Sequence, residues 1–200
     1  MSPTAHRYFI INKPYNMVSQ FVSNDAVRLL GDINYHFPKG THAIGRLDSL
    51  SEGLLILSTN KQLTRLLFEG AVPHKRKYLV QVNSSLTEES LERMRAGISF
   101  KIKGGKFYQS LPCEVSPAEK PDDLFSNGLR LNENQATAWV YITLTEGKYH
   151  QVRKMVGALR HRCIRLIRVS IEDLELGNLQ PGEIMEIPED KIFLKLGIAH

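Results

Sequence analysis

Two acidic side chains in the first third of the chain stand where a carboxylate could do chemistry. Asp48 follows Gly-Arg-Leu at positions 45–47, and Glu52 lies directly before the glycine that precedes the apolar run 54–57. A carboxylate at the junction of a loop and a core strand is a common functional arrangement, because the strand fixes its position. Asp also stabilises turns by bonding to its own backbone. The residue pattern leaves both interpretations of Asp48 open.

Two nearby carboxylates also raise the possibility of glycoside hydrolysis, in which one acts as an acid and the other as a nucleophile. In an extended segment Asp48 and Glu52 are about 13 Å apart, which disfavours that reaction. A basic surface is also a poor match to such an enzyme. A glycoside hydrolase is therefore a weak candidate.

Basic residues are distributed unevenly along the chain. The net charge is +5, and the segment from Lys148 to Arg168 holds seven Lys or Arg residues and no acid. A second basic cluster occupies positions 74–77, whereas 172–190 contains seven acids and no base. Such asymmetry is typical of proteins that bind nucleic acid. A solvated helix face is an equally good explanation of the basic segment taken alone.

Several classes of protein are disfavoured by what the sequence lacks. Two cysteines, Cys113 and Cys163, are too few for a disulfide scaffold and suit a reducing compartment. No apolar run has the length of a membrane span, and no phosphate-loop or dinucleotide-binding motif is present. His161 and Cys163 lack a second ligand pair with zinc-like spacing. We expect a soluble, cytoplasmic monomer without metal, nucleotide cofactor or membrane partner.

The elements that position these residues are short strands and about three helices, which predicts an α+β fold with a mostly antiparallel sheet. Helices are expected after residue 60, where Leu63, Leu66 and Leu67 share a face up to Gly70, from the N-cap Thr87 to Gly97, and along the apolar stripe 152–159. Strands are expected at 8–11, 54–57, 78–82, 138–144, 164–171 and 183–187. Loops are expected at 31–43 and 116–135, and a hairpin turn at 103–106.

Five segments, taken in order, resemble the family of RNA pseudouridine synthases typified by ribosomal small subunit pseudouridine synthase A. They are 12–14 (Asn-Lys-Pro), 45–55 (Gly-Arg-Leu-Asp and the residues that follow), 77–80, 146–155 and 165–168. Segment 12–21 is most similar to the subgroup called large subunit pseudouridine synthase E. The resemblance implies the pseudouridine synthase fold, an α+β fold with a mostly antiparallel mixed sheet in two packed halves and a central active-site cleft. It also implies one catalytic domain over 1–200, without the S4-type RNA-binding domain of many members.

The resemblance implies an isomerase that cleaves the N-glycosidic bond of a uridine, rotates the uracil and rejoins it through carbon 5. Asp48 would be the catalytic carboxylate. Arg153 would form an ion pair that keeps it ionised, and Tyr78 would stack on the flipped base. No cofactor is needed.

The resemblance further implies a substrate uridine in large-subunit (23S) ribosomal RNA. Arg46 would fill the space left by the flipped nucleotide. Other residues would contact the RNA: Lys13, Lys75, Arg76, Lys77, Lys148, Gln151, Lys154 and Arg165. The competing hypothesis is a non-catalytic RNA-binding or ribosome assembly factor, which explains the basic segments but not the joint presence of Asp48, Tyr78 and Arg153.

Overall fold

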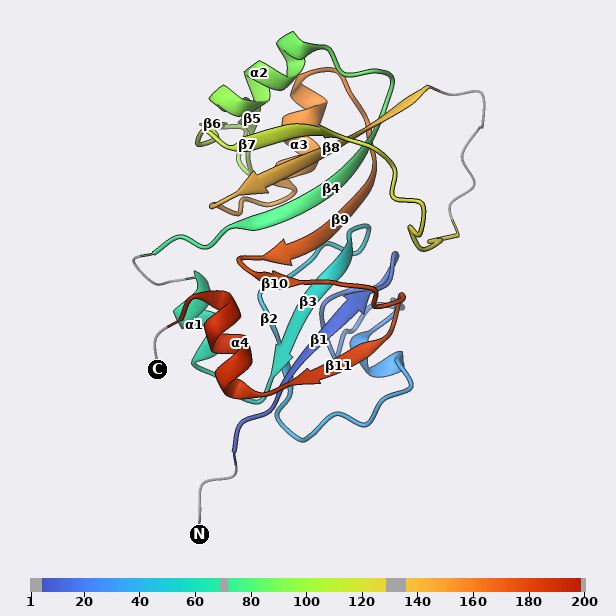
Figure 1. Ribbon diagram of the computed structural model, residues 1–200, viewed down its shortest axis with the longest axis vertical. Helices are drawn as coiled ribbons and strands as arrows, with labels where there is room; N and C mark the ends of the chain where they lie inside the picture. Colours follow the sequence, from blue (N-terminus) through green and yellow to red (C-terminus); the bar gives the residue numbers. More distant parts are fainter. Residues whose placement is uncertain (1–4, 69–71, 129–135, 199–200) are drawn as a thin grey trace. The chain divides into compact units, whose positions relative to one another are not determined.

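The chain divides into two compact units in a computed structural model that describes residues 5–68, 72–128 and 136–198 (Figure 1). Unit 1 comprises residues 1–74 and 168–200, and unit 2 comprises residues 75–167. The chain leaves unit 1 just before strand β4 (Arg76–Asn83) and returns to it within strand β9 (Cys163–Ile171). Each unit has its own strands and helices.

Two fully buried strands form the centre of unit 1. Strand β1 (Tyr8–Lys13) pairs antiparallel with β3 (Glu52–Ser58), so that Ile10 lies opposite Ile56. Strand β11 (Ile184–Ile187) pairs with the other edge of β1, while β2 (His42–Ile44) pairs with β3. The two-residue β10 (Leu174–Glu175) pairs with the end of β9. These pairs are all antiparallel.

Both faces of β1 are covered, which explains why it is apolar without alternation. Tyr8 meets Phe193 of helix α4 (Glu189–Leu196) edge-to-face, with ring centroids 5.8 Å apart. Phe9 points the other way and meets Tyr35 and Phe37 at 5.8 and 5.9 Å. The alternation of side chains along a strand therefore gives aromatic neighbours to both faces.

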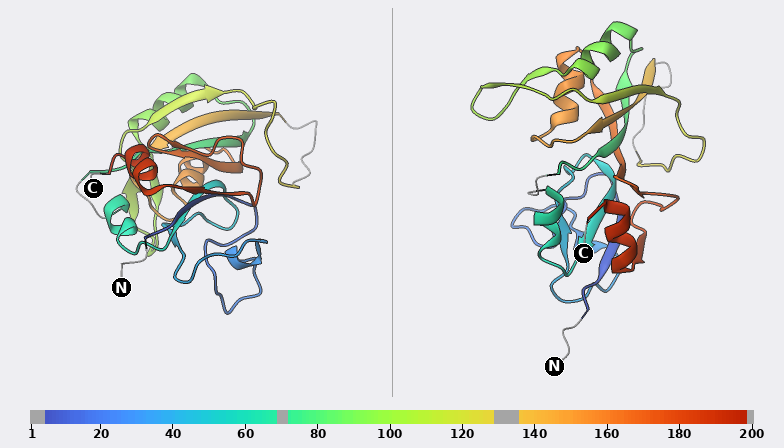
Figure 2. Two further views of the ribbon diagram at one scale, coloured as in Figure 1. Left: turned by 60° about the horizontal axis from the view of Figure 1, so that its bottom comes forward. Right: turned by 60° about the vertical axis from the view of Figure 1, so that its left-hand side comes forward.

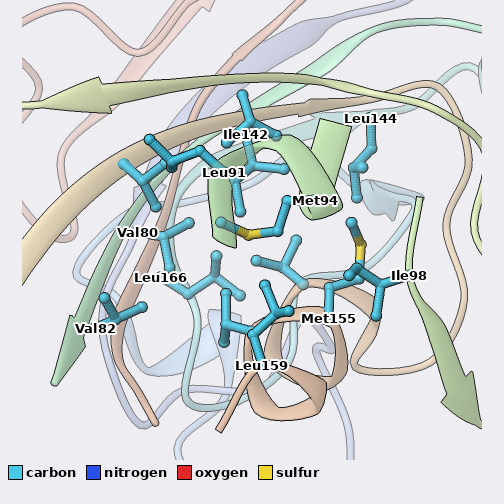
Figure 3. Close-up of a cluster of buried hydrophobic side chains, with 14 of the residues drawn as sticks. Val80, Val82, Leu91, Met94, Ile98, Ile142, Leu144, Met155, Leu159 and Leu166 are labelled. Atoms are coloured by element: carbon cyan, nitrogen blue, oxygen red, sulfur yellow. The ribbon is translucent and has the colours of Figure 1, made fainter. Parts of the chain in front are cut away.

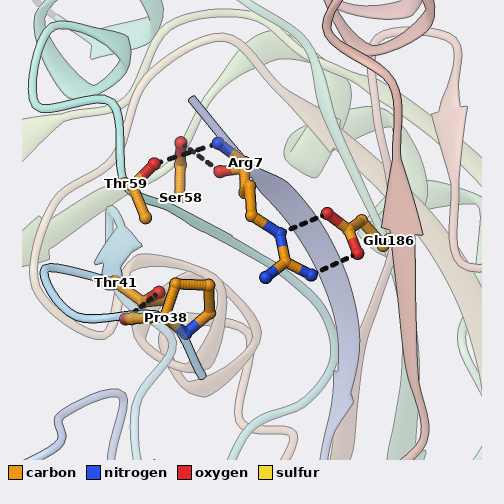
Figure 4. Close-up of polar contacts among 6 residues, drawn as sticks. All are labelled: Arg7, Pro38, Thr41, Ser58, Thr59 and Glu186. Atoms are coloured by element: carbon orange, nitrogen blue, oxygen red, sulfur yellow. Dashed lines mark hydrogen bonds and ion pairs between the residues drawn. The ribbon is translucent and has the colours of Figure 1, made fainter. Parts of the chain in front are cut away.

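Polar contacts secure the start of β1 to its neighbours (Figure 4). The guanidinium of Arg7 donates from Nε and Nη2 to the two carboxylate oxygens of Glu186, each at 2.6 Å. The Arg7 backbone N–H donates to Thr59 Oγ1 at 2.9 Å, and its carbonyl accepts from Ser58 Oγ at 2.9 Å. The residue before β1 is thus bonded to both neighbouring strands.

Unit 2 packs two helices on a β-sheet. Strand β8 (Thr137–Leu144) lies between β4 and β7 (Glu114–Ala118), antiparallel to both. Helices α2 (Glu88–Ala96) and α3 (Gln151–Ala158) cover one face (Figure 2). Their apolar side chains form one cluster with those of the strands (Figure 3), including Val80, Val140, Leu91, Met94, Val152 and Met155. A separate hairpin joins β5 (Ser99–Lys101) to β6 (Phe107–Gln109).

The predicted α+β class is confirmed, and so are several local signals. Thr87 caps α2 by accepting a hydrogen bond from Ser90 N at 3.2 Å, and Gly97 ends that helix. In β8, Val140, Ile142 and Leu144 are buried as the alternation predicts. The turn at 103–106 contains Gly104 and Gly105 with φ of 85° and 76°.

Other predictions were incomplete. The loop predicted at 31–43 begins inside the short 3-10 helix η1 (Leu30–Asp32) and ends with β2. The loop predicted at 116–135 overlaps the edge strand β7, where Pro117 is tolerated because an edge position needs no N–H donor. Helix α4 was not predicted. Helix α1 (Leu63–Phe68) lies where expected, but Gly70 and residues 129–135 fall outside the described residues.

Candidate active site

Asp48 lies in the loop that joins β2 to β3 in unit 1. The loop closes as a turn, in which Ser51 N donates to the carbonyl of Asp48 at 2.9 Å. The Asp48 side chain is half-buried, whereas Glu52 at the start of β3 is buried. Because residues 48–51 turn, the separation of about 13 Å expected for an extended segment does not apply. The two carboxylates differ in accessibility, because Glu52 is buried and Asp48 is only half-buried.

Gly45 permits a close approach of this loop to helix α1. Its φ is +70°, and a Cβ at this position would lie 2.7 Å from Cε2 of Phe68. An L-side chain is disfavoured both by this backbone conformation and by the Phe68 ring. The exposed Arg46 and the buried Leu47 follow directly. The glycine of the Gly-Arg-Leu-Asp segment is therefore explained by packing.

Ser19 holds the backbone just before Asp48. Its buried hydroxyl donates to the carbonyl oxygen of Leu47 at 2.8 Å and accepts from the N–H of Leu47 at 3.0 Å. The same segment supplies Met17 N, which donates to the carbonyl of Ser49 at 3.3 Å. Both residues flanking Asp48 are thus bonded to residues 17–19. Nothing local in the sequence indicated this role for Ser19.

Lys13 is buried beside the same turn. Its Nζ donates to the carbonyls of Met17 at 2.6 Å, Pro14 at 2.9 Å and Ser49 at 3.4 Å. Burial lowers the pKa of Lys13 to about 7, against the opposing effect of the Glu52 and Asp48 carboxylates. With no exposed surface, Lys13 is placed to hold the backbone of the turn, which does not agree with the predicted phosphate contact.

The other candidate catalytic residues belong to unit 2. Tyr78 lies on β4 opposite Ile142, and its partly buried ring packs against the apolar cluster. Arg153 lies on α3, and its Nη1 donates to the carbonyl of Cys163 at 3.4 Å. A regular strand and a regular helix therefore position these two side chains within their unit.

The basic cluster at the start of β4 has mixed surroundings. Lys75 forms an exposed ion pair with Glu114 at 2.8 Å, and such pairs stabilise little. The ammonium of exposed Lys77 lies 4.4 Å from the centroid of the Tyr141 ring. Arg76 is half-buried and approaches Gly147, where a Cβ would lie 3.2 Å from its Nη1. Lys75 and Lys77 are the accessible cations of this cluster.

Gln151 is buried at the start of α3 and stabilises the loop before it. Its Nε2 donates to Glu146 Oε1 at 2.6 Å, and its Oε1 accepts from Lys148 N at 2.8 Å. Glu146 also accepts from Leu111 N at 2.9 Å and from the hydroxyl of Tyr108. Because both ends of the Gln151 amide are engaged, its placement favours a role in the loop over the predicted RNA contact. The role of Glu146 was missed from the sequence.

Arg165 is also mostly buried. Its Nη2 donates to the carbonyl of Phe125 at 3.2 Å, and the guanidinium lies 5.3 Å from the centroid of the Phe125 ring. By contrast, Lys148 is exposed and Lys154 is half-buried, and both lie close to the start of α3. Both lysines are therefore more accessible than Arg165, the third cation of segment 148–168 that was predicted to contact RNA.

The described residues hold no group of three or more His, Cys, Asp or Glu side chains arranged to bind a metal ion. Within the same ranges, no helix combines the length and hydropathy of a membrane span. Burial raises the pKa of both Cys113 and Cys163 to about 11, so neither thiol is activated.

Comparisons with known proteins identify the family of the chain. A family model described as RNA pseudouridylate synthase matches residues 7–158. Ribosomal large subunit pseudouridine synthase E of Vibrio parahaemolyticus is 36% identical over 182 residues, which cover 90% of this chain and 74% of that protein. The protein of the same name from Xanthomonas axonopodis is 32% identical over 86% of this chain and 89% of its own length.

A solved structure is similar as well. The crystal structure of a pseudouridylate synthase that is 25% identical to this chain matches it with a TM-score of 0.76, over 96% of this chain and 74% of the other. The family model, the curated relatives and this structure all identify the same enzyme class. The chain therefore belongs to the RNA pseudouridylate synthase family and is a pseudouridine synthase, an isomerase.

Proposed function

We propose that this pseudouridine synthase converts one uridine of large-subunit (23S) ribosomal RNA, with Asp48 as the catalytic carboxylate. The observation that carries the proposal is the support around Asp48, whose two neighbours in the chain, Leu47 and Ser49, are both hydrogen-bonded to residues 13–19. Catalysis depends on a reacting group held in one position. A carboxylate that only capped a turn would not need hydrogen bonds that fix the residues on both sides of it.

The reaction asks one carboxylate to act on a base that has left its stack. In this proposal Asp48 acts at the sugar or base of the flipped uridine while the N-glycosidic bond breaks, and the freed uracil rejoins through carbon 5. Tyr78 stacks on the uracil, which is worth about 1–3 kcal/mol per base. The proton lost from carbon 5 goes to solvent, and N1, released from the sugar, takes up a proton. The product is therefore an isomer of the substrate, and no redox partner is needed.

The remaining site residues complete the proposal. Arg153 supplies the positive charge that balances the Asp48 carboxylate, for which its planar guanidinium is well suited. Arg46 occupies the space left by the flipped nucleotide, while Lys75, Lys77, Lys148 and Lys154 contact phosphates. We assign Lys13, Gln151 and Arg165 to holding the structure around the site. Arg76 is half-buried, so we propose that only the exposed part of its guanidinium contacts RNA.

Ribosomal RNA is proposed as substrate because the curated relatives are named ribosomal large subunit pseudouridine synthases. We propose accordingly that the enzyme acts in the cytoplasm, where ribosomes are built. We further propose that both units form a single catalytic domain and that the protein acts as a monomer. Light scattering on the purified protein tests the monomeric state.

The central test is Asp48→Asn, which removes the charge and keeps the shape. Pseudouridine formation, followed as release of tritium from carbon 5 of labelled uridine in ribosomal RNA, is expected to vanish while RNA binding stays within about threefold. The matched control Asp25→Asn changes an exposed acid of the same unit and should keep the wild-type rate. A wild-type rate for Asp48→Asn would refute the assignment.

Mapping pseudouridines in ribosomal RNA from cells with and without the gene tests the substrate. One large-subunit position is expected to lose its modification. An unchanged map would overturn the proposed substrate while leaving the enzyme class intact. The cells without the gene also supply unmodified RNA for the assay.

A further inference from the structure

The hairpin formed by β5 and β6 in unit 2 carries a concentrated positive charge. Lys101, Lys103 and Lys106 are all exposed, and residues 97–113 contain no Asp or Glu. The two strands are three residues each, and residues 102–106 join them. Gly104 and Gly105 adopt φ of 85° and 76°, and a Cβ at either position would meet no atom within 4 Å. The lysines therefore project from a tip with free space around it.

Aromatic rings lie among these cations. Phe107 is 69% exposed and sits opposite Lys101, whose Nζ lies 5.6 Å from the centroid of its ring. Tyr149, in the loop before α3, is 71% exposed and stacks on His150 with centroids 3.8 Å apart and planes inclined by 18°. Large rings are costly to leave in water. Two such rings beside lysines indicate a surface that is covered by a ligand.

The hairpin and the start of α3 are connected through side chains of unit 2. The ammonium of Lys154 lies 5.9 Å from the centroid of Phe100 in β5 and 5.3 Å from that of Tyr149. Lys148 lies 4.8 Å from the centroid of Tyr108 in β6. The Glu146–Gln151 hydrogen bond holds the loop between them at 2.6 Å. One surface thus extends from the hairpin tip to α3.

We propose that this surface, the hairpin face (Lys101, Lys103, Lys106, Phe107, Tyr149 and Lys154), binds a segment of the substrate RNA outside the target nucleotide. The lysines contact phosphates, and Tyr149 and Phe107 stack on unpaired bases. The inference rests on the proposed ribosomal RNA substrate and extends it with a second binding surface.

The chemistry of the face favours RNA over other polyanions. Lysine ammoniums attract any anion, but a stacked Tyr149–His150 pair presents a flat, exposed ring next to positive charge. Unpaired bases of RNA are flat, lie next to phosphates and are recognised by such rings. An anionic lipid surface offers charge without flat groups, and an acidic peptide offers few. RNA is the ligand that offers both phosphates for the lysines and flat bases for the exposed rings.

The test compares two triple variants with the same loss of charge. The hairpin variant is Lys101→Ser/Lys103→Ser/Lys106→Ser, and the control is Lys39→Ser/Lys61→Ser/Lys191→Ser, which removes three exposed lysines of unit 1. Each is titrated with unmodified large-subunit ribosomal RNA, measuring Kd and its salt dependence, and then kcat and KM for tritium release. Thermal unfolding confirms that both variants fold.

For the hairpin variant we expect Kd and KM to rise about tenfold or more with kcat at saturating RNA unchanged. Its slope of log Kd against the logarithm of salt concentration should fall by about 2, because each of the three lost phosphate contacts on a single strand contributes about 0.7. The control triple should change Kd less than about threefold. Tyr149→Ala should raise Kd about tenfold without changing the salt slope, and Lys→Arg at the three hairpin positions should restore binding.

Distinct results would overturn the inference. Equal weakening by the two triple variants would reduce the effect to overall charge, and an unchanged Kd for Tyr149→Ala would remove the stacking contact. Hairpin-dependent binding to phosphatidylserine vesicles that exceeds binding to RNA would assign the face to a membrane. If wild-type protein binds the RNA through the hairpin but forms no pseudouridine, the proposed function fails alone. If wild type is active and the hairpin variants match it, this inference fails alone.

Discussion

The hydroxyl of Ser19 makes two hydrogen bonds to one residue, accepting from Leu47 N at 3.0 Å and donating to Leu47 O at 2.8 Å. The Leu47 carbonyl belongs to the peptide bond that leads into Asp48. The buried Ser19 side chain therefore limits the rotation of that peptide and, through it, the direction of the carboxylate. Ser19 is a positioning residue, acting through the backbone.

Ser19→Ala is expected to lower kcat by about tenfold while leaving the Kd for RNA unchanged. A buried N–H and C=O that lose a partner cost about 1–3 kcal/mol each, and the turn relaxes to recover water contacts. Kinetics below the unfolding temperature separate this effect from loss of protein. Ser116→Ala on the exposed edge strand is the control. A drop in stability with kcat unchanged would make Ser19 purely structural.

Gly45→Ala is expected to destabilise the protein more than Gly40→Ala. Both glycines have positive φ, +70° and +89°, so a Cβ costs about 1–2 kcal/mol at either position. Only at Gly45 would the Cβ also meet the Phe68 ring, at 2.7 Å, whereas Gly40 has no atom within 4 Å. Denaturant unfolding measures the difference. Equal losses for the two variants would contradict the packing explanation, and Phe68→Leu should partly rescue Gly45→Ala.

Lys13 predicts a pH dependence of stability. Its pKa is lowered by burial from 10.5 to about 7, so between these values the unfolded chain holds a proton that the folded chain has released. The free energy of unfolding therefore rises with pH across this window, and the gain is lost as the pH falls back through 7. Unfolding of wild type and Lys13→Met, measured from pH 6 to about 10, should show this rise in wild type only.

The exposed Lys191 supplies the control for that experiment, because Lys191→Met removes a lysine in solvent. It should leave the pH profile of wild type unchanged. A difference between wild type and Lys13→Met that stays constant over the window would contradict the lowered pKa.

Gln151→Ala distinguishes a loop-stabilising role from an RNA contact. Removing a buried amide that bonds to Glu146 and Lys148 N should cost about 1–3 kcal/mol of stability. The salt slope of RNA binding should stay unchanged, because no phosphate contact is lost. Lys148→Ala should show the reverse, with stability kept and the slope reduced by about 0.7. Loss of affinity with full stability for Gln151→Ala would return it to the RNA interface.

The sequence by itself determined most of the elements. Thr87 and Gly97 mark the ends of α2, and the alternation in 138–144 marks β8, because capping and side-chain periodicity act within a few residues. The same kind of signal was present for α4, where Pro188 precedes the first turn and Gly197 ends the helix with φ of 64°. Local signals in the sequence therefore encode α4 as well.

Only the tertiary structure decided what several polar residues do. Lys13 before a proline resembled an exposed turn residue, but its ammonium bonds to Ser49, 36 positions away. Ser19 reaches Leu47 across 28 positions, and Arg165 reaches Phe125 across 40. Burial and hydrogen-bond partners depend on which distant segments fold together, and no local pattern encodes that distance. The sequence thus identified the enzyme family and its carboxylate-bearing loop, while the fold decided which neighbours hold that loop in place.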